Sequence, residues 1–163
     1  MVYTKVLDKI PEGFIKVNAK LKECYNNVFH FAMINSELFK TENMRIAYGF
    51  MNDKNTSEYL WFRHCFILDK KNNIIDITFL ENDIPVQGNR YIIFKTFKNA
   101  NQLLKIDNFL DNPSLAGHLL NEEKELLKQY VDIAQYKFIE NSTFANDIVV
   151  FNLDKEKKEE PRG

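Results

Sequence analysis

Apolar residues in the first quarter of the chain recur at the spacing of a helix. From Cys24 to about Phe39 they fall near three-to-four spacing, and neither glycine nor proline interrupts them. The pattern predicts a helix over this range, with a break at Asn35 or Ser36. Residues 14–22, just upstream, fit a short strand or a helical turn equally well.

The pattern then changes to long apolar runs that are typical of strands. Residues 44–51 and 59–69 read as two strands, and the second is rich in aromatic and aliphatic side chains. The polar tetrapeptide 70–73 (KKNN) predicts a hairpin turn, and residues 74–79 (IIDITF) predict the returning strand. Residues 91–97 (YIIFKTF) predict another strand. The order of elements is that of an antiparallel meander.

The C-terminal part predicts one more helix and one more strand. The helix is expected from about 115 to 136, with Asn121 capping a start that is followed by acidic residues. Residues 144–153 predict a last strand, and the charged segment 154–163 a disordered tail. Helix, antiparallel sheet and helix together indicate an α+β fold, with residues 1–153 forming a single domain.

Composition narrows the class of protein. Of the 163 residues, 45% are hydrophobic, which is enough apolar surface for a folded core. The formal charge of −1 gives no net basic face for nucleic acid, so we expect no nucleic-acid partner. No apolar run reaches the roughly 18–20 residues of a membrane span, and the N-terminal residues lack the apolar centre of a signal peptide. We therefore expect a cytoplasmic protein without a membrane partner.

The two cysteines, Cys24 and Cys65, are too few for a disulfide framework, and both are expected to be reduced. The chain has no zinc-ligand spacing, no phosphate-binding glycine loop and no dinucleotide fingerprint. No cofactor is expected from these patterns, which leaves the two thiols as the candidate reactive groups.

Cys24 stands at the start of the first predicted helix. A thiol in this position meets the positive end of the helix dipole, which favours the thiolate, the nucleophilic form. Backbone N–H groups at the same helix end can also receive an oxyanion. One position thus offers a nucleophile and part of an oxyanion hole.

His64 and Asp76 are polar residues inside apolar runs, so each needs a hydrogen-bond partner. A hairpin centred near residues 71–72 brings position 64 opposite positions 78–80, which leaves Asp76 diagonal to His64 and within reach. The pair would face the first helix. In such a triad, Cys24 attacks an acyl carbon, His64 pairs with the thiolate and protonates the leaving group, and Asp76 orients the ring.

The segments CYNN (24–27), RIAYGFM (45–51) and FRHCFILDKKNNIIDITF (62–79) resemble the core of the transglutaminase-like and papain-like cysteine enzymes, in particular small bacterial or phage members. The resemblance covers about residues 18–80. It implies a Cys-bearing helix packed on an antiparallel sheet, with Cys24, His64 and Asp76 as nucleophile, base and orienting acid.

The resemblance also implies an amide side chain upstream of the cysteine that completes the oxyanion hole. The family commonly uses glutamine, and Asn18 is the candidate here. Other residues have simpler interpretations. Cys65 is expected to be structural, His30 to lie on the far side of the first helix from Cys24, and His118 to be exposed.

Three functional hypotheses remain open from the sequence. The first is a thiol-dependent hydrolase or acyltransferase that acts on a peptide, an isopeptide or a small amide through a thioester. The second is a catalytically silent binding or inhibitory protein on the same scaffold, possibly phage-encoded and directed at a host protein. Arg63, Cys65 and the missing glutamine favour this alternative. The third, a small-ligand or nucleotide-binding module, is disfavoured by the lack of glycine loops and basic patches. The oligomeric state stays open.

Overall fold

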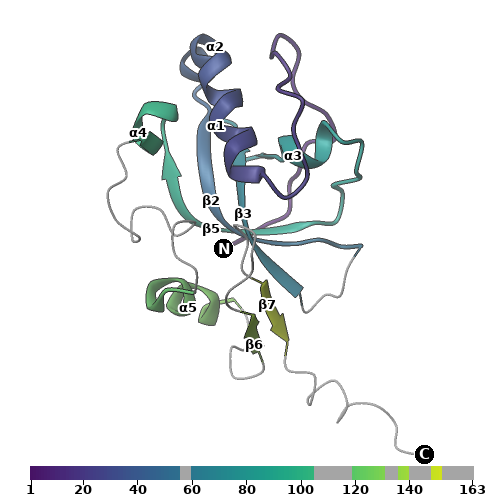
Figure 1. The fold of residues 1–163 in the computed structure, drawn as a ribbon, viewed down its shortest axis with the longest axis vertical. Coiled ribbons are helices and arrows are strands. Elements are labelled where there is room, and N and C mark those ends of the chain that lie inside the picture. The colour runs from purple at the N-terminus through teal and green to yellow at the C-terminus, as the bar shows by residue number, and fades with distance from the viewer. Residues whose placement is uncertain (56–59, 105–118, 131–135, 140–147, 152–163) are drawn as a thin grey trace, which may run out of the picture.

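The protein is described from a computed structural model, which covers residues 1–55, 60–104, 119–130, 136–139 and 148–151 (Figure 1). The helices are α1 (Cys24–Ile34), α2 (Ser36–Thr41), α3 (Ile77–Leu80), α4 (Ala100–Leu104) and α5 (Asn121–Lys128), and the strands are β1 (Val2–Tyr3), β2 (Arg45–Asn52), β3 (Leu60–Leu68), β4 (Ile74–Ile75), β5 (Arg90–Phe97), β6 (Tyr136–Ile139) and β7 (Ile148–Phe151).

The strands form one antiparallel sheet in the order β1-β5-β2-β3-β7-β6, and β4 pairs with β3 beside this path. The expected α+β fold is confirmed. The expected meander is wrong in one respect, because β5 returns across the sheet and pairs with β2 instead of with its predecessor β4. The buried apolar strands β2 and β3 therefore lie at the centre, with partners on both sides.

Helix α1 stands against the sheet beside β3, and α3 lies next to it (Figure 1). Helix α1 buries one stripe of side chains at helical spacing: Cys24, Asn27, Val28, Phe31 and Ala32. The expected break is confirmed at Asn35. Its side-chain amide and its backbone N–H both donate to the carbonyl of Phe31, at 3.0 and 3.1 Å, and α1 ends and α2 begins on either side of it.

The hairpin turn is confirmed, but the returning strand is shorter than expected. The N–H of Asp69 donates to the carbonyl of Asn73 at 3.1 Å, and Asn72 adopts a left-handed φ of 64°. Only Ile74 and Ile75 pair with β3. The prediction of a strand over 74–79 is wrong beyond that point, because Asp76 caps α3 and turns the chain into a helix.

The C-terminal predictions hold only in part. Helix α5 covers only Asn121–Lys128 of the expected 115–136, and its N-cap position is Leu120 instead of Asn121. Strand β6 begins at Tyr136, the last residue of the expected helix. Strand β7 occupies Ile148–Phe151 of the expected 144–153. The expected ranges also include residues 115–118, 131–135, 144–147 and 152–153, which lie outside the described residues together with the segment 154–163. Residues 14–22 contain neither a strand nor a helix.

Across the described part of the chain, no helix combines the length and apolarity needed to cross a bilayer.

Gly49 sits at an irregularity in β2, directly opposite His64 of β3. The register between β2 and β5 shifts between Tyr48 and Gly49, so the backbones approach closely there. A Cβ atom on Gly49 would lie 1.8 Å from the carbonyl oxygen of Ile92, which no side-chain rotation can relieve. Glycine at this position lets the strand that faces His64 pass close to β5.

We therefore expect Gly49→Ala to lower the free energy of unfolding by about 2–3 kcal/mol, because strand backbones must move apart. Urea denaturation measures the change. Gly13→Ala is the matched control: its Cβ would have an ordinary contact of 3.7 Å with Leu38, and only its φ of 91° would be strained. The control should lose about 1 kcal/mol. Equal losses in the two variants would contradict the steric argument.

Candidate thiol site

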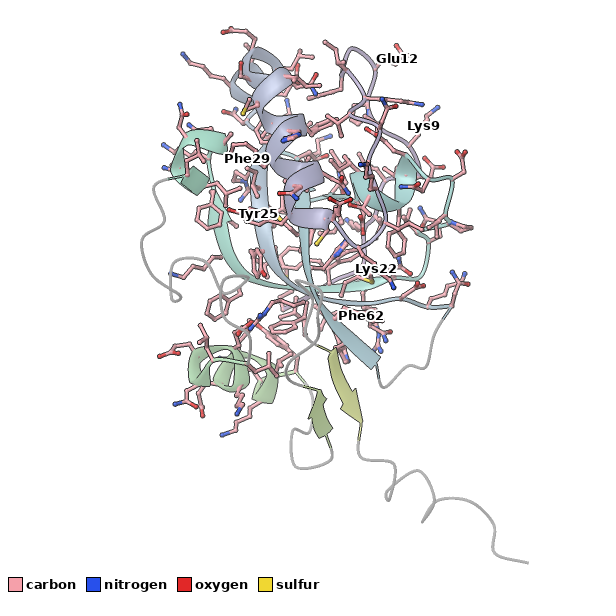
Figure 2. All side chains as sticks on the ribbon, viewed as in Figure 1. Lys9, Glu12, Lys22, Tyr25, Phe29 and Phe62 are labelled. Carbon is pink, nitrogen blue, oxygen red and sulfur yellow. The ribbon has the colours of Figure 1, made fainter. Side chains whose placement is uncertain are left out.

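β3 supplies the middle of the candidate site, and its strand partners on the side away from β2 change along its length. On this side β3 pairs with β7 through Leu60–Phe62 and with β4 through Ile67–Leu68. The intervening stretch includes His64 and Cys65, and α1 and α3 both contact β3. The N-terminal end of α1 thereby reaches the middle of a buried strand. Figure 2 shows Lys22 just before this end of the helix, with Tyr25 within its first turn.

Asp76 is the central acceptor of the site. One of its carboxylate oxygens, Oδ2, lies 2.9 Å from Nε2 of His64 and accepts a hydrogen bond from the hydroxyl of Tyr91 at 2.7 Å. The other, Oδ1, accepts the N–H of Phe79 at 3.5 Å as the cap of α3. Asp76 is fully buried, so these donors replace the water that it loses. The expected contact between His64 and Asp76 is present in the structure.

His64 connects Asp76 to Cys24. Its Nε2 is engaged by Asp76, and its ring also forms a side-chain hydrogen bond with Cys24. Burial lowers the pKa of His64, but the Asp76 carboxylate and then Cys24 more than offset this, and the pKa rises from 6.5 to about 10. The imidazole is therefore protonated at neutral pH. The structure thus brings Cys24, His64 and Asp76 together.

The rings around His64 hold it in place. Phe66 stacks on it at 6.1 Å between centroids, and Phe79 meets it edge-on at 6.0 Å. Tyr91 lies at 6.4 Å and supplies the second hydrogen bond to Asp76. Burial, and after it the Asp76 charge, raise the pKa of Tyr91 well above its usual range, so its hydroxyl stays protonated and donates. The imidazole has little room to rotate.

Cys65 lies next to the site, but its thiol stays protonated. It is fully buried in the cluster that also contains Cys24. Burial raises the pKa of Cys65 well above its usual range, and nearby Cys24 and Asp76 raise it further. Cys65 therefore remains a protonated thiol at neutral pH, in line with the structural role expected for it.

The segment before Cys24 is held by side chains of α1 and of the α3 region. The N–H groups of Val17 and Ala19 donate to the Glu81 carboxylate at 3.0 and 2.8 Å. The Asn27 amide bridges the carbonyl of Lys20 at 2.8 Å and the hydroxyl of Thr78 at 2.9 Å. These bonds close the segment over the beginning of α1, and Cys24 is only 3% exposed.

The other candidate residues lie apart from this chain of contacts. Asn18 is exposed with a left-handed φ of 57°, and no hydrogen bond described for the chain joins its side chain to Cys24. Its oxyanion role stays a prediction. His30 is exposed on α1, and His118 lies outside the described residues. Within the described part of the chain, no group of three or more His, Cys, Asp or Glu side chains could hold a metal ion.

One residue of the site, Tyr91, and one buried partner of β3, Glu123, were missed in the sequence. Tyr91 lies in a buried strand, where a tyrosine hydroxyl needs a polar partner, and that requirement was its available signal. Glu123 of α5 forms a buried bidentate ion pair with Arg63, at 2.6 and 2.9 Å. A charged Arg63 within an apolar strand was the signal for a buried acidic partner.

Fold and site together define an α+β protein with a buried thiol–imidazole–carboxylate chain beside the middle of β3. No family model, no curated protein and no solved structure matches this chain. The function must therefore be inferred from the residues of the site and their geometry.

Proposed function

We propose that the protein is a thiol-dependent hydrolase or acyltransferase, built on a papain-like or transglutaminase-like arrangement, that acts on a peptide, an isopeptide or a small amide. The observation that carries the proposal is the continuous chain from Cys24 through His64 to Asp76, with Asp76 also bound by Tyr91. A protonated imidazole beside a thiol is the arrangement that keeps a cysteine in its nucleophilic form.

The reaction would proceed in two halves. The Cys24 sulfur attacks the acyl carbon, and the oxyanion that forms meets the positive end of α1. His64 gives its proton to the departing amine, which leaves a thioester on Cys24. Water or a second amine then attacks the thioester while His64 takes up the proton of the nucleophile, and the thiolate is regenerated. Water as the acceptor gives hydrolysis, and an amine gives acyl transfer.

Asp76 and Tyr91 act on the imidazole and not on the substrate. The carboxylate fixes the orientation of the ring through Nε2, which directs the opposite ring nitrogen to Cys24. The Tyr91 hydroxyl and the cap on α3 fix the carboxylate in turn. Both are positioning residues in this proposal.

The second candidate function is a catalytically silent binding or inhibitory protein that acts on a protein partner, for which a phage-encoded protein directed at a host factor stays a hypothesis. Burial favours it: Cys24 is 3% exposed and His64 is 4% exposed. A substrate can reach the sulfur only if the segment before α1 moves. The two functions predict different thiol chemistry, so one experiment separates them.

The test combines thiol labelling with acyl trapping in a Cys65→Ala background. Iodoacetamide alkylation of Cys24, followed by intact mass between pH 5 and pH 9, should stay fast well below pH 7. It should acquire the steep pH dependence of an ordinary thiol in His64→Ala. Incubation with p-nitrophenyl acetate should then add one acetyl group to Cys24, which hydroxylamine removes.

His30→Ala is the matched control for loss of an imidazole from the exposed side of α1, and it should behave like the parent. Two results together would contradict the enzymatic proposal. Cys24 would label with the same pH profile with and without His64, and it would form no acyl adduct. The binding function would then stand.

A further inference from the structure

A second feature of the surface lies at the opposite end of α1 from Cys24. The end of α1 and the adjoining α2, the start of β2, the turn after β3 and the start of α4 enclose an open groove of about 1110 Å³. Ala32, on its wall, is eight residues along α1 from Cys24, which is about 12 Å at the rise of a helix. None of the residues that line the groove belongs to the thiol site.

Most of the charged residues that line the groove are positive. Lys40, Arg45, Lys70 and Lys98 line it, against the single acidic residue Glu37. The chain as a whole has a formal charge of −1, so this positive surface is local. A neighbouring cavity of about 390 Å³ has mixed charge, because Glu12, Glu42 and Asp69 line it together with Lys70 and Lys71. (Glu12 is labelled in Figure 2.)

The polar wall of the groove is partly pre-organised. The Arg45 guanidinium donates from Nη2 to the carbonyl of Asp69 at 3.1 Å and to the side-chain oxygen of Asn72. These bonds hold the cation at the rim of the turn. Asparagine side chains from three separate segments, Asn43, Asn72 and Asn99, also line the groove. Each amide can both donate to and accept from a peptide backbone.

We propose that this groove binds an acidic peptide segment of a partner protein. The charge complementarity identifies an anionic ligand, and the volume exceeds the roughly 300–1,000 Å³ of pockets for small molecules. Nucleic acid fits less well, because the only aromatic ring among the lining residues, Phe39, is 2% exposed and gives bases no stacking platform. The inference goes beyond the thiol chemistry and does not depend on it.

The probe is a fluorescein-labelled ten-residue peptide of alternating Glu and Ser, compared with the same peptide carrying Gln in place of Glu. Anisotropy titration at low salt should show binding of the Glu peptide well above that of the Gln peptide. Binding should weaken markedly at 300 mM salt, because exposed charges are screened there. The double variant Lys70→Glu with Lys98→Glu should bind the Glu peptide about tenfold more weakly or worse, since two attractive contacts become repulsive.

The matched control reverses two exposed lysines away from the groove, Lys9→Glu with Lys16→Glu, and so changes net charge by the same amount. Figure 2 places Lys9 beside the N-terminal loop, on the far side of α1 from α4. This variant and Cys24→Ala should bind like the parent, and circular dichroism should show both double variants folded. Equal affinity for the two peptides, equal weakening by the two double variants, or tighter binding of a ten-nucleotide single strand would each overturn the proposal.

Discussion

Replacement of Glu123 by alanine is expected to lower the free energy of unfolding by about 3–5 kcal/mol, because it leaves the Arg63 guanidinium buried without its countercharge. The Arg63 and Glu123 side chains are 0% and 1% exposed, and they share a bidentate pair. Glu123 also accepts the N–H of Leu120 at 2.9 Å, so the same change removes a cap from α5. Equilibrium denaturation in urea measures the loss.

The neighbouring Glu125→Ala is the control for this change. Glu125 pairs with Lys128 at the surface, where the two side chains are 69% and 50% exposed, and its loss should cost no more than about 0.5 kcal/mol. The double replacement Arg63→Met with Glu123→Leu should recover most of the stability, because it removes both charges and keeps apolar volume. A loss in Glu123→Ala no larger than in Glu125→Ala would show that the buried pair does not hold α5 to β3.

The second large effect is on the pH dependence of stability. The folded state raises the pKa of His64 from 6.5 to about 10, so folding favours the protonated imidazole. This stabilisation is fully present below about pH 6.5 and is lost as the pH rises through about 10. The contribution of His64 to the free energy of unfolding should therefore fall across this window by about 3–5 kcal/mol, at a steepest rate of about 1.4 kcal/mol per pH unit.

Asp76→Asn should remove most of this dependence, because burial alone lowers the pKa of His64 and the carboxylate is the largest contribution that raises it. Urea denaturation at one-unit intervals from pH 6 to pH 10 gives the slopes for the parent and the variant. His30→Gln, which changes an exposed imidazole on α1, should keep the slope of the parent. Parallel curves for the parent and Asp76→Asn would contradict the assignment of the slope to His64.

The central strands and the first helix could be predicted because their hydrophobic patterns are long and their periods are clear. The run 59–69 differs from β3 by one residue at each end, and the run 91–97 matches β5 except for Arg90. The break at Asn35 was also visible, since asparagine bonds to its own backbone. The order in which the strands pair could not be predicted, because nothing in the segment 91–97 shows that it pairs with β2 instead of β4.

Asp76 shows why part of the site could not be predicted. The segment IIDITF alternates as a strand does, but an aspartate followed by a short apolar run is also a helix cap, and the cap forms here. The contact with His64 survived this error because it depends on the hairpin turn, which was read correctly. Tyr91 and Glu123 were missed because their partners are distant in sequence. Glu123 in particular reads as an ordinary acid of a solvated helix start, and only the position of α5 shows that it is buried.

The side chains of the thiol site are also interior packing of the fold. Cys24 lies in the same apolar cluster as Phe31 and Ile67, while Phe66 and Phe79 enclose His64. The residues of the site are also core residues, so the fold cannot be lost without losing the site. Loss of the proposed Cys24 reactivity on heating should then coincide with loss of the native state, and most substitutions that raise the melting temperature should also prolong that reactivity.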